Sequence, residues 1–199
     1  MVPPEAKGLV LFAHGSGSGR HSPRNQFVAS QLQDAGVATL LFDLLTTAEE
    51  QEDYYTGHLR FDIELLADRL VHAFRAMEED PEVRHLGMGL FGASTGGGAA
   101  VVAAAQLGDR IRAIVSRGGR PDLAGHALKQ VTAPTLLIVG SEDRLVIQLN
   151  EQAARALRCK KALRIIAGAG HLFEEPGTLD TAARLAADWF VEHLPPEDP

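Results

Sequence analysis

The sequence contains a single cysteine, Cys159, among its 199 residues. An internal disulfide bond is therefore impossible, which is typical of proteins that work in a reducing compartment. The chain also lacks an apolar run of the roughly 18 residues that a membrane span needs. Its first residues lack the basic and apolar regions of a signal peptide. We therefore expect a cytoplasmic protein with no membrane partner.

Positive charge is also scarce in this chain. The sequence has 19 Lys and Arg residues against 26 Asp and Glu residues, which gives a formal net charge of -7. Nucleic acids and anionic membranes require a basic surface, so neither is an expected partner. A length of 199 residues suits one domain with its own hydrophobic core. We predict a single domain over residues 1–199, with residues 195–199 as a frayed tail.

Short apolar runs alternate with longer segments of helical pattern. Runs of this length are too short for free-standing helices and are typical of strands that are covered on both faces. Such alternation predicts an α/β fold with a mostly parallel sheet of about six to seven strands and right-handed crossovers. The predicted strands cover residues 8–13, 37–42, 86–91, 111–115, 135–139 and 163–167. The predicted helices cover residues 23–35, 59–77, 96–107, 146–157 and 178–193.

The longest segment without such a pattern covers residues 44–58 and contains the acidic run 49–53. Runs of charge are usually solvated, so we interpret this segment as an acidic surface loop. The alternative is a loop that lies over the active site.

The sharpest motif is Gly-Ala-Ser-Thr-Gly at residues 92–96. It follows a predicted strand and opens a predicted helix, which is the context of a nucleophile elbow. A tight turn there exposes the serine hydroxyl, and glycines two residues before and after the serine avoid collisions with the backbone. We predict Ser94 as the nucleophile. The alternative is a glycine-rich helix start with a bystander serine.

A serine nucleophile needs a general base and an orienting carboxylate, in the chain order Ser, Asp or Glu, His. Asp143 follows the predicted strand 135–139, and His171 follows the predicted strand 163–167. We predict Asp143 and His171 for these roles, with the neighbouring Glu142 as the less favoured acid. Surface or capping roles are the simplest interpretation of His58, His72, His85, His126 and His193, and Cys159 has no evident catalytic partner.

An acyl-transfer site also needs donors for the developing oxyanion. We predict the backbone N–H groups of Thr95 and Ser16, the latter in the glycine-rich loop 14–19. Such a loop can also cradle phosphate. It lacks a G-K-[ST] ending and a G-x-G-x-x-G pattern, however, so a nucleotide site is not expected.

Together these motifs resemble the α/β-hydrolase superfamily, and most closely its small members related to dienelactone hydrolases. The resemblance implies an α/β-hydrolase fold, a Ser94–His171–Asp143 triad, and hydrolysis of an ester or related acyl bond with no cofactor and no metal. Dienelactone hydrolases proper use a cysteine nucleophile, so the serine here argues against dienelactone as substrate. Residues 14–25 and 116–122 are also similar to hydrolase-like proteins, some of them attached to phosphoribosyltransferase domains.

Larger relatives insert a helical lid after the strand at 111–115, and this chain has room only for residues 116–130 there. We therefore expect an open, shallow site without a large lid, which suits a small-molecule acyl substrate. Three residues are assigned to substrate binding: His14, Arg117 and Arg120. The two arginines could hold a substrate carboxylate or simply be surface charges. Two other functions remain open, a non-catalytic binding module and an acyltransferase that uses the same residues.

Overall fold

A computed structural model describes residues 1–195 of the chain. Its centre is one six-stranded sheet with the order β2-β1-β3-β4-β5-β6, and every neighbouring pair is parallel. The predicted parallel α/β sheet is therefore confirmed. The strands are β1 (Leu9–Ala13), β2 (Ala38–Leu41), β3 (Met88–Ala93), β4 (Ile111–Arg117), β5 (Thr135–Gly140) and β6 (Lys161–Ile166).

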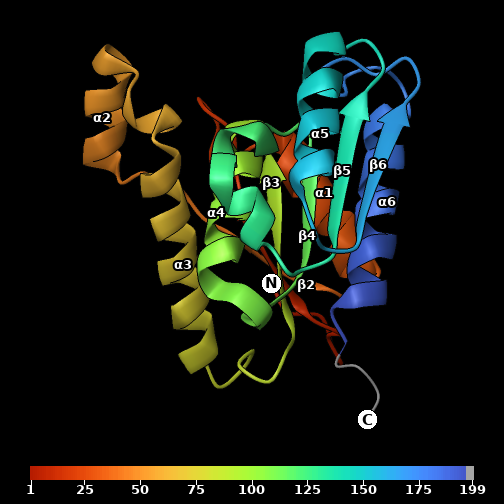
Figure 1. Cartoon of the computed structure of the whole chain (residues 1–199). Coiled ribbons are helices and arrows are strands. Elements are labelled where there is room, and N and C mark those ends of the chain that lie inside the picture. Colours follow the sequence, from red (N-terminus) through yellow and green to blue (C-terminus); the bar gives the residue numbers. More distant parts are fainter. Residues whose placement is uncertain (196–199) are drawn as a thin grey trace.

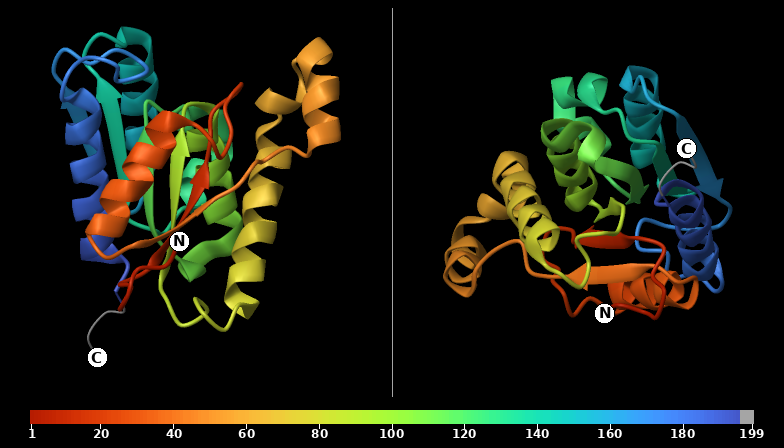
Figure 2. Two further views of the ribbon diagram at one scale, coloured as in Figure 1. Left: turned by 180° about the vertical axis from the view of Figure 1, so that it is seen from behind. Right: turned by 90° about the horizontal axis from the view of Figure 1, so that it is seen from below.

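Helices cover both faces of this sheet. Helices α1 and α6 pack together on one face, and α3, α4 and α5 lie on the other (Figures 1 and 2). The helices are α1 (Pro23–Asp34), α2 (Thr47–Thr56), α3 (Ile63–Glu79), α4 (Thr95–Leu107), α5 (Arg144–Ala156) and α6 (Thr178–His193). Short 3₁₀ segments cover Leu59–Phe61 (η1), Gly108–Arg110 (η2) and Pro121–Gln130 (η3).

The core forms on the two faces of the central strands. In β1, Leu11 belongs to the cluster under α3 and α4, whereas Val10 and Phe12 belong to the cluster under α1 and α6. Leu90 and Phe91 divide in the same way on β3. This alternation follows from the two-residue period of a strand, and it explains why these strands are apolar throughout.

Helix α3 begins four residues later than predicted. Asp62 caps it by accepting a 3.0 Å hydrogen bond from the backbone N–H of Leu65, and side-chain caps of this kind fix where a helix starts. The chain before the cap forms η1 instead. Phe61, within the predicted helix 59–77, therefore lies in η1 and is 58% exposed.

The prediction of an acidic surface loop at residues 44–58 was wrong, because residues 47–56 form α2. A capping box starts this helix: Thr46 Oγ1 accepts from the Glu49 N–H at 3.3 Å, and the Glu49 carboxylate accepts from the Thr46 N–H at 2.7 Å. Gly57 ends it in the left-handed conformation, with φ of 66°. Helix α2 stands beyond the end of α3, away from the sheet (Figure 1).

The fold has no large lid, as predicted, since the connection from β4 to β5 contains only η3. None of the helices in residues 1–195 is both long and apolar enough to cross a membrane. The predicted frayed tail, apart from Pro195, lies outside the described residues.

Candidate active site

The strand order reverses between β1 and β3, because the chain leaves β1 for β2 on one side and returns to β3 on the other. In open α/β sheets, ligands bind outside the carboxyl ends of the strands at this reversal. The loop after β1 and the turn after β3 meet at this point. The turns after β4, β5 and β6 lie along the same edge, because all six strands are parallel.

Ser94 occupies the turn between β3 and α4 with φ of 51° and ψ of -124°. Few non-glycine residues adopt a positive φ, and such strain is typical of functional turns. The flanking glycines are required by close backbone approach. A Cβ on Gly92 would lie 2.4 Å from the Gly96 carbonyl oxygen, and one on Gly96 would lie 2.2 Å from the Ala13 carbonyl oxygen. The motif therefore forms the tight strand–turn–helix that its sequence predicts.

His171 and Asp143 lie next to each other after β6 and β5. His171 Nδ1 is 2.6 Å from an Asp143 carboxylate oxygen. The Asp143 side chain is 16% exposed and the His171 side chain 40% exposed. Glu142, the less favoured acid, bonds instead to Ser141 Oγ at 2.9 Å. The structure thus pairs His171 with Asp143.

Ser94 and His171 line the same pocket of about 260 Å³. Within residues 1–195, no hydrogen bond joins Ser94 Oγ to the imidazole. Contacts of this kind are often long in unliganded sites and tighten when substrate binds.

Glu175 anchors the loop that carries His171, a role that the sequence did not reveal. Its carboxylate accepts a 3.0 Å hydrogen bond from the Gly170 N–H. This bond is the main cause of the lowered pKa of Glu175, because it stabilises the charged carboxylate. The backbone immediately before His171 is thereby fixed.

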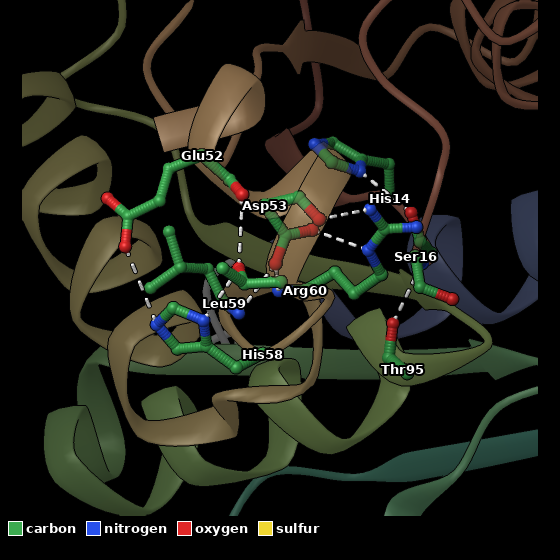
Figure 3. Close-up of polar contacts among 10 residues, drawn as sticks. His14, Ser16, Glu52, Asp53, His58, Leu59, Arg60 and Thr95 are labelled. Atoms are coloured by element: carbon green, nitrogen blue, oxygen red, sulfur yellow. Dashed lines mark hydrogen bonds and ion pairs between the residues drawn. The ribbon is translucent and has the colours of Figure 1, made fainter. Parts of the chain in front are cut away.

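The two predicted oxyanion donors belong to neighbouring segments. The Thr95 N–H lies at the start of α4, beside Ser94. The Ser16 N–H donates a 2.9 Å hydrogen bond to Thr95 Oγ1 (Figure 3). The structure thus brings both residues together, with the Ser16 donor already engaged by the Thr95 side chain.

His14 holds the glycine-rich loop in place. Its Nε2 accepts a 3.0 Å hydrogen bond from the Leu44 N–H, so Nδ1 carries the proton and donates to the Gly15 carbonyl oxygen at 3.0 Å. Both ring nitrogens are used by the backbone. This argues against the direct substrate contact that we assigned to His14.

The two candidate arginines have different surroundings. Arg120 forms a two-point ion pair with Asp122, with N···O distances of 2.9 and 2.8 Å, and hydrogen bonding to Asp122 raises its pKa. Its guanidinium is already satisfied, and it does not line the pocket of Ser94. The structure therefore does not place Arg120 beside Arg117, where the two could bind one substrate carboxylate together.

Arg117 is only 7% exposed and lines the pocket that contains Ser94. Its Nη2 is 3.3 Å from Asn25 Oδ1, and its guanidinium carbon lies 5.8 Å from the ring centres of Phe91 and Phe173. Burial lowers the pKa of Arg117 to about 10, and repulsion by Arg24 contributes to this. The side chain is nevertheless charged at neutral pH.

A second, larger hollow of about 710 Å³ is also lined by the glycine-rich loop. Its walls include His21 and Arg24 beside the loop, and Tyr54 and Arg60 from α2 and η1. The two hollows share Arg24 and residues of the loop. The site therefore has no large lid, and the acidic segment lines the larger hollow beside it.

Asp53 and Arg60 stabilise that wall (Figure 3). The Asp53 carboxylate accepts hydrogen bonds from the Leu59 N–H at 2.7 Å, from the Arg60 N–H at 3.2 Å, and from Arg60 Nε. Burial alone raises the pKa of Asp53, but these bonds outweigh it and the pKa is lowered overall. In the described part of the chain, no group of three or more His, Cys, Asp or Glu residues is placed to hold a metal ion.

A parallel sheet with a serine elbow after β3, and an acid and a histidine after later strands, defines an α/β hydrolase. The family model described as "Alpha/beta hydrolase domain" matches residues 6–188, so the chain belongs to this family. The crystal structure of dienelactone hydrolase from Anabaena variabilis is 59% identical in sequence, with a TM-score of 0.95, over 97% of this chain and 89% of that chain. The protein is a dienelactone-hydrolase-like α/β hydrolase.

Other relatives are informative in different ways. Est1E from Butyrivibrio proteoclasticus shares the fold, with a TM-score of 0.76 at 16% identity over 95% of this chain and 89% of that one. A curated Mycobacterium tuberculosis protein, whose name proposes a phosphoribosyl transferase, is 55% identical over 193 residues. That match covers 97% of this chain but only 43% of the relative, so the chain spans less than half of that protein's length.

Proposed function

We propose that the chain is a serine hydrolase that cleaves a small ester or related acyl bond through an acyl-enzyme intermediate. The observation that carries this proposal is the Asp143–His171 hydrogen bond beside the pocket that Ser94 lines. The hydrolase family supports the reaction type. The single cysteine favours a reducing compartment such as the cytoplasm.

Ser94 Oγ attacks the acyl carbon while His171 Nε2 takes the hydroxyl proton. The alcohol then leaves with that proton, and a water molecule, activated by the same imidazole, hydrolyses the acyl-enzyme. Asp143 holds Nδ1, which directs Nε2 towards the reaction and stabilises the imidazolium that forms.

The oxyanion is stabilised by the N–H groups of Thr95 and Ser16 and by the positive end of the α4 dipole. The Ser16 N–H donates to Thr95 Oγ1 before the reaction and donates to the oxyanion, in addition or instead, as the oxyanion develops. The 260 Å³ pocket accommodates a short acyl group and the substrate atoms next to it, and the neighbouring 710 Å³ hollow accommodates the more distant part of a larger substrate.

The test combines turnover with active-site labelling. The purified chain should hydrolyse p-nitrophenyl acetate and react with a fluorophosphonate probe at Ser94. Ser94→Ala should abolish both, while Ser30→Ala, at an exposed helix position, should preserve both. A chain that neither hydrolyses short esters nor labels at Ser94 would overturn the proposal.

Acyl transfer to another acceptor would use the same residues, and adding alcohols to the assay separates the two reactions. Ester product in place of free acid would identify a transferase. The relative's name points to phosphoribosyl transfer instead, but this chain aligns with only 43% of that protein, and the hydrolase family covers residues 6–188 here. We therefore propose acyl-bond hydrolysis, and not phosphoribosyl transfer, for this chain.

A further inference from the structure

A buried positive charge lies beside Ser94, and no residue in the described range 1–195 supplies a counter-ion for it. Arg117 is 7% exposed, and its Nη1 is buried with no hydrogen-bond partner in residues 1–195. Among the described residues, its one side-chain hydrogen-bond partner, Asn25, is neutral, and the rings of Phe91 and Phe173 beside it carry no charge. Buried charges in proteins are normally paired, so this guanidinium favours a bound anion beside it.

A second guanidinium faces the same pocket. Arg24, in the first turn of α1, lines both hollows. Its carboxylate partner, Glu174, is 3.3 Å away and 67% exposed, and exposed pairs of this kind are weak. Arg24 is close enough to Arg117 to lower its pKa by repulsion. An anion bound between the two arginines would relieve that repulsion.

The remaining lining of this pocket also favours an anion. Although the chain has a net charge of -7, the pocket is lined by two arginines and by no Asp or Glu. Ser18 and Ser22 contribute hydroxyl groups, and the N-terminal turn of the 12-residue helix α1 contributes the positive end of its dipole.

We propose that this pocket binds a phosphate monoester group carried by the substrate, with Arg117 and Arg24 as its cationic residues. Two guanidiniums match the charge of a phosphate dianion better than that of a carboxylate, and the serine hydroxyls suit its additional oxygens. Because Ser94 lines the same 260 Å³ pocket, the phosphate lies within a few atoms of the acyl bond. The inference rests on the proposed function of Ser94.

The test uses two substrates that differ only in the phosphate, 1-acetylglycerol 3-phosphate and 1-acetylglycerol. We expect kcat/KM to favour the phosphorylated ester by about 30-fold or more, since charged hydrogen bonds of this kind change affinities by roughly 10- to 100-fold. Arg24→Gln should reduce that preference by about tenfold. Arg155→Gln, on an exposed side chain of α5, should leave both rates unchanged.

Arg117 is buried, so Arg117→Lys keeps the charge and Arg117→Met removes it. The lysine variant should retain part of the preference and the methionine variant should lose it. The ratio of the two rates is the readout, and circular dichroism checks that each variant folds. If the Arg117→Met variant failed to fold, the lysine variant and Arg24→Gln would still test the site.

Calorimetry with inorganic phosphate on the Ser94→Ala chain tests the site without turnover. Binding should weaken in the Ser94→Ala/Arg24→Gln double variant, and acetate at equal ionic strength should not compete. Hydrolysis of both esters at equal rates, with no phosphate binding, would overturn the phosphate site and leave the hydrolase intact. Phosphate binding without any ester hydrolysis would overturn the hydrolase alone. If acetate displaced bound phosphate at similar concentrations, the pocket would be a carboxylate site and this inference would be overturned.

Discussion

His171 and Asp143 are 28 residues apart in the sequence and are joined by a 2.6 Å contact between Nδ1 and a carboxylate oxygen. The contact exists because β5 and β6 are adjacent and parallel, so the turns that follow them meet at one edge of the sheet. Glu142 is next to Asp143 but is engaged by Ser141. Of the two neighbouring carboxylates, only Asp143 therefore contacts the imidazole, and substitutions can distinguish them.

Asp143→Asn should reduce kcat for p-nitrophenyl acetate by about 10⁴-fold. The amide no longer holds the imidazole in the required tautomer, and the equivalent change in a Ser-His-Asp protease has an effect of roughly that size. Glu142→Gln is the matched control and should change kcat little. Equal losses in the two variants, or full activity of Asp143→Asn, would contradict the assignment of Asp143.

Thr95→Val should lower kcat by about tenfold. The Thr95 hydroxyl accepts the Ser16 N–H at 2.9 Å and so fixes the glycine-rich loop against the elbow. Loss of that bond removes about 1 kcal/mol of interaction and loosens a donor that works best when it is held in place. Thr95→Ser keeps the hydroxyl and should retain most activity. A rise in kcat for Thr95→Val would instead show that the hydroxyl competes with the oxyanion for the Ser16 donor.

The sheet and the elbow could be predicted because their signals are local. Each inner strand is a short apolar run, and the glycines around Ser94 are required by contacts within the turn itself. The parallel order then brings Asp143 and His171 to one edge without any knowledge of side-chain positions.

Helix α2 escaped prediction for a physical reason. Asp53 is its one buried residue, so the helix has no apolar stripe to reveal its period. Its stability comes from polar contacts at its two ends, and the Thr46-x-x-Glu49 pattern of the capping box was the signal available in the sequence. The acidic run 49–53 favoured a solvated loop instead, so the capping box was not recognised as the start of a helix.

The arginines of the pocket could be predicted only in part. Arg117 follows directly from its place at the end of β4. The sequence analysis assigned Arg120 to the same substrate-binding role as Arg117. Its side chain instead forms an ion pair with Asp122, two residues further along the chain. Arg24 reaches the same pocket from α1 by tertiary folding, and no local pattern links it to Arg117.

Loss of the α2 cap should be visible as a local effect. Thr46→Ala should destabilise this helix by about 1 kcal/mol, the usual cost of removing an N-cap side chain. Hydrogen–deuterium exchange in residues 47–56 should rise, while exchange in α4 stays unchanged. An equal rise in both helices would mean that α2 unfolds only together with the whole chain.

The same cap should be sensitive to pH. The hydrogen bond from the Thr46 backbone lowers the pKa of Glu49 below its ordinary value of 4.5. A lowered carboxylate pKa stabilises the folded state fully above that ordinary value, and the contribution is lost as the pH falls through the folded pKa. Exchange in α2, corrected for intrinsic rates, should therefore rise below about pH 4.5. Glu49→Gln should remove this pH dependence, and Glu52→Gln, further along the helix, should keep it.

The close contact between the end of β1 and the start of α4 should tolerate almost no added side-chain volume. A Cβ on Gly96 would lie 2.2 Å from the Ala13 carbonyl oxygen and 2.7 Å from the His14 carbonyl oxygen, both backbone atoms. Gly96→Ala should therefore cost about 3 kcal/mol, the upper range for overpacking, and lower the Tm by roughly 6–12 °C for a chain of this size.

Gly168→Ala separates this clash from the cost of the backbone conformation. Gly168 has φ of 73° and open space around its Cβ position, so alanine there should cost only about 1 kcal/mol. Thermal unfolding of the two variants should give the larger loss for Gly96→Ala. The reverse order would mean that the loop after β1 moves freely away from α4, in which case Ser16 could not be held beside Thr95 as an oxyanion donor.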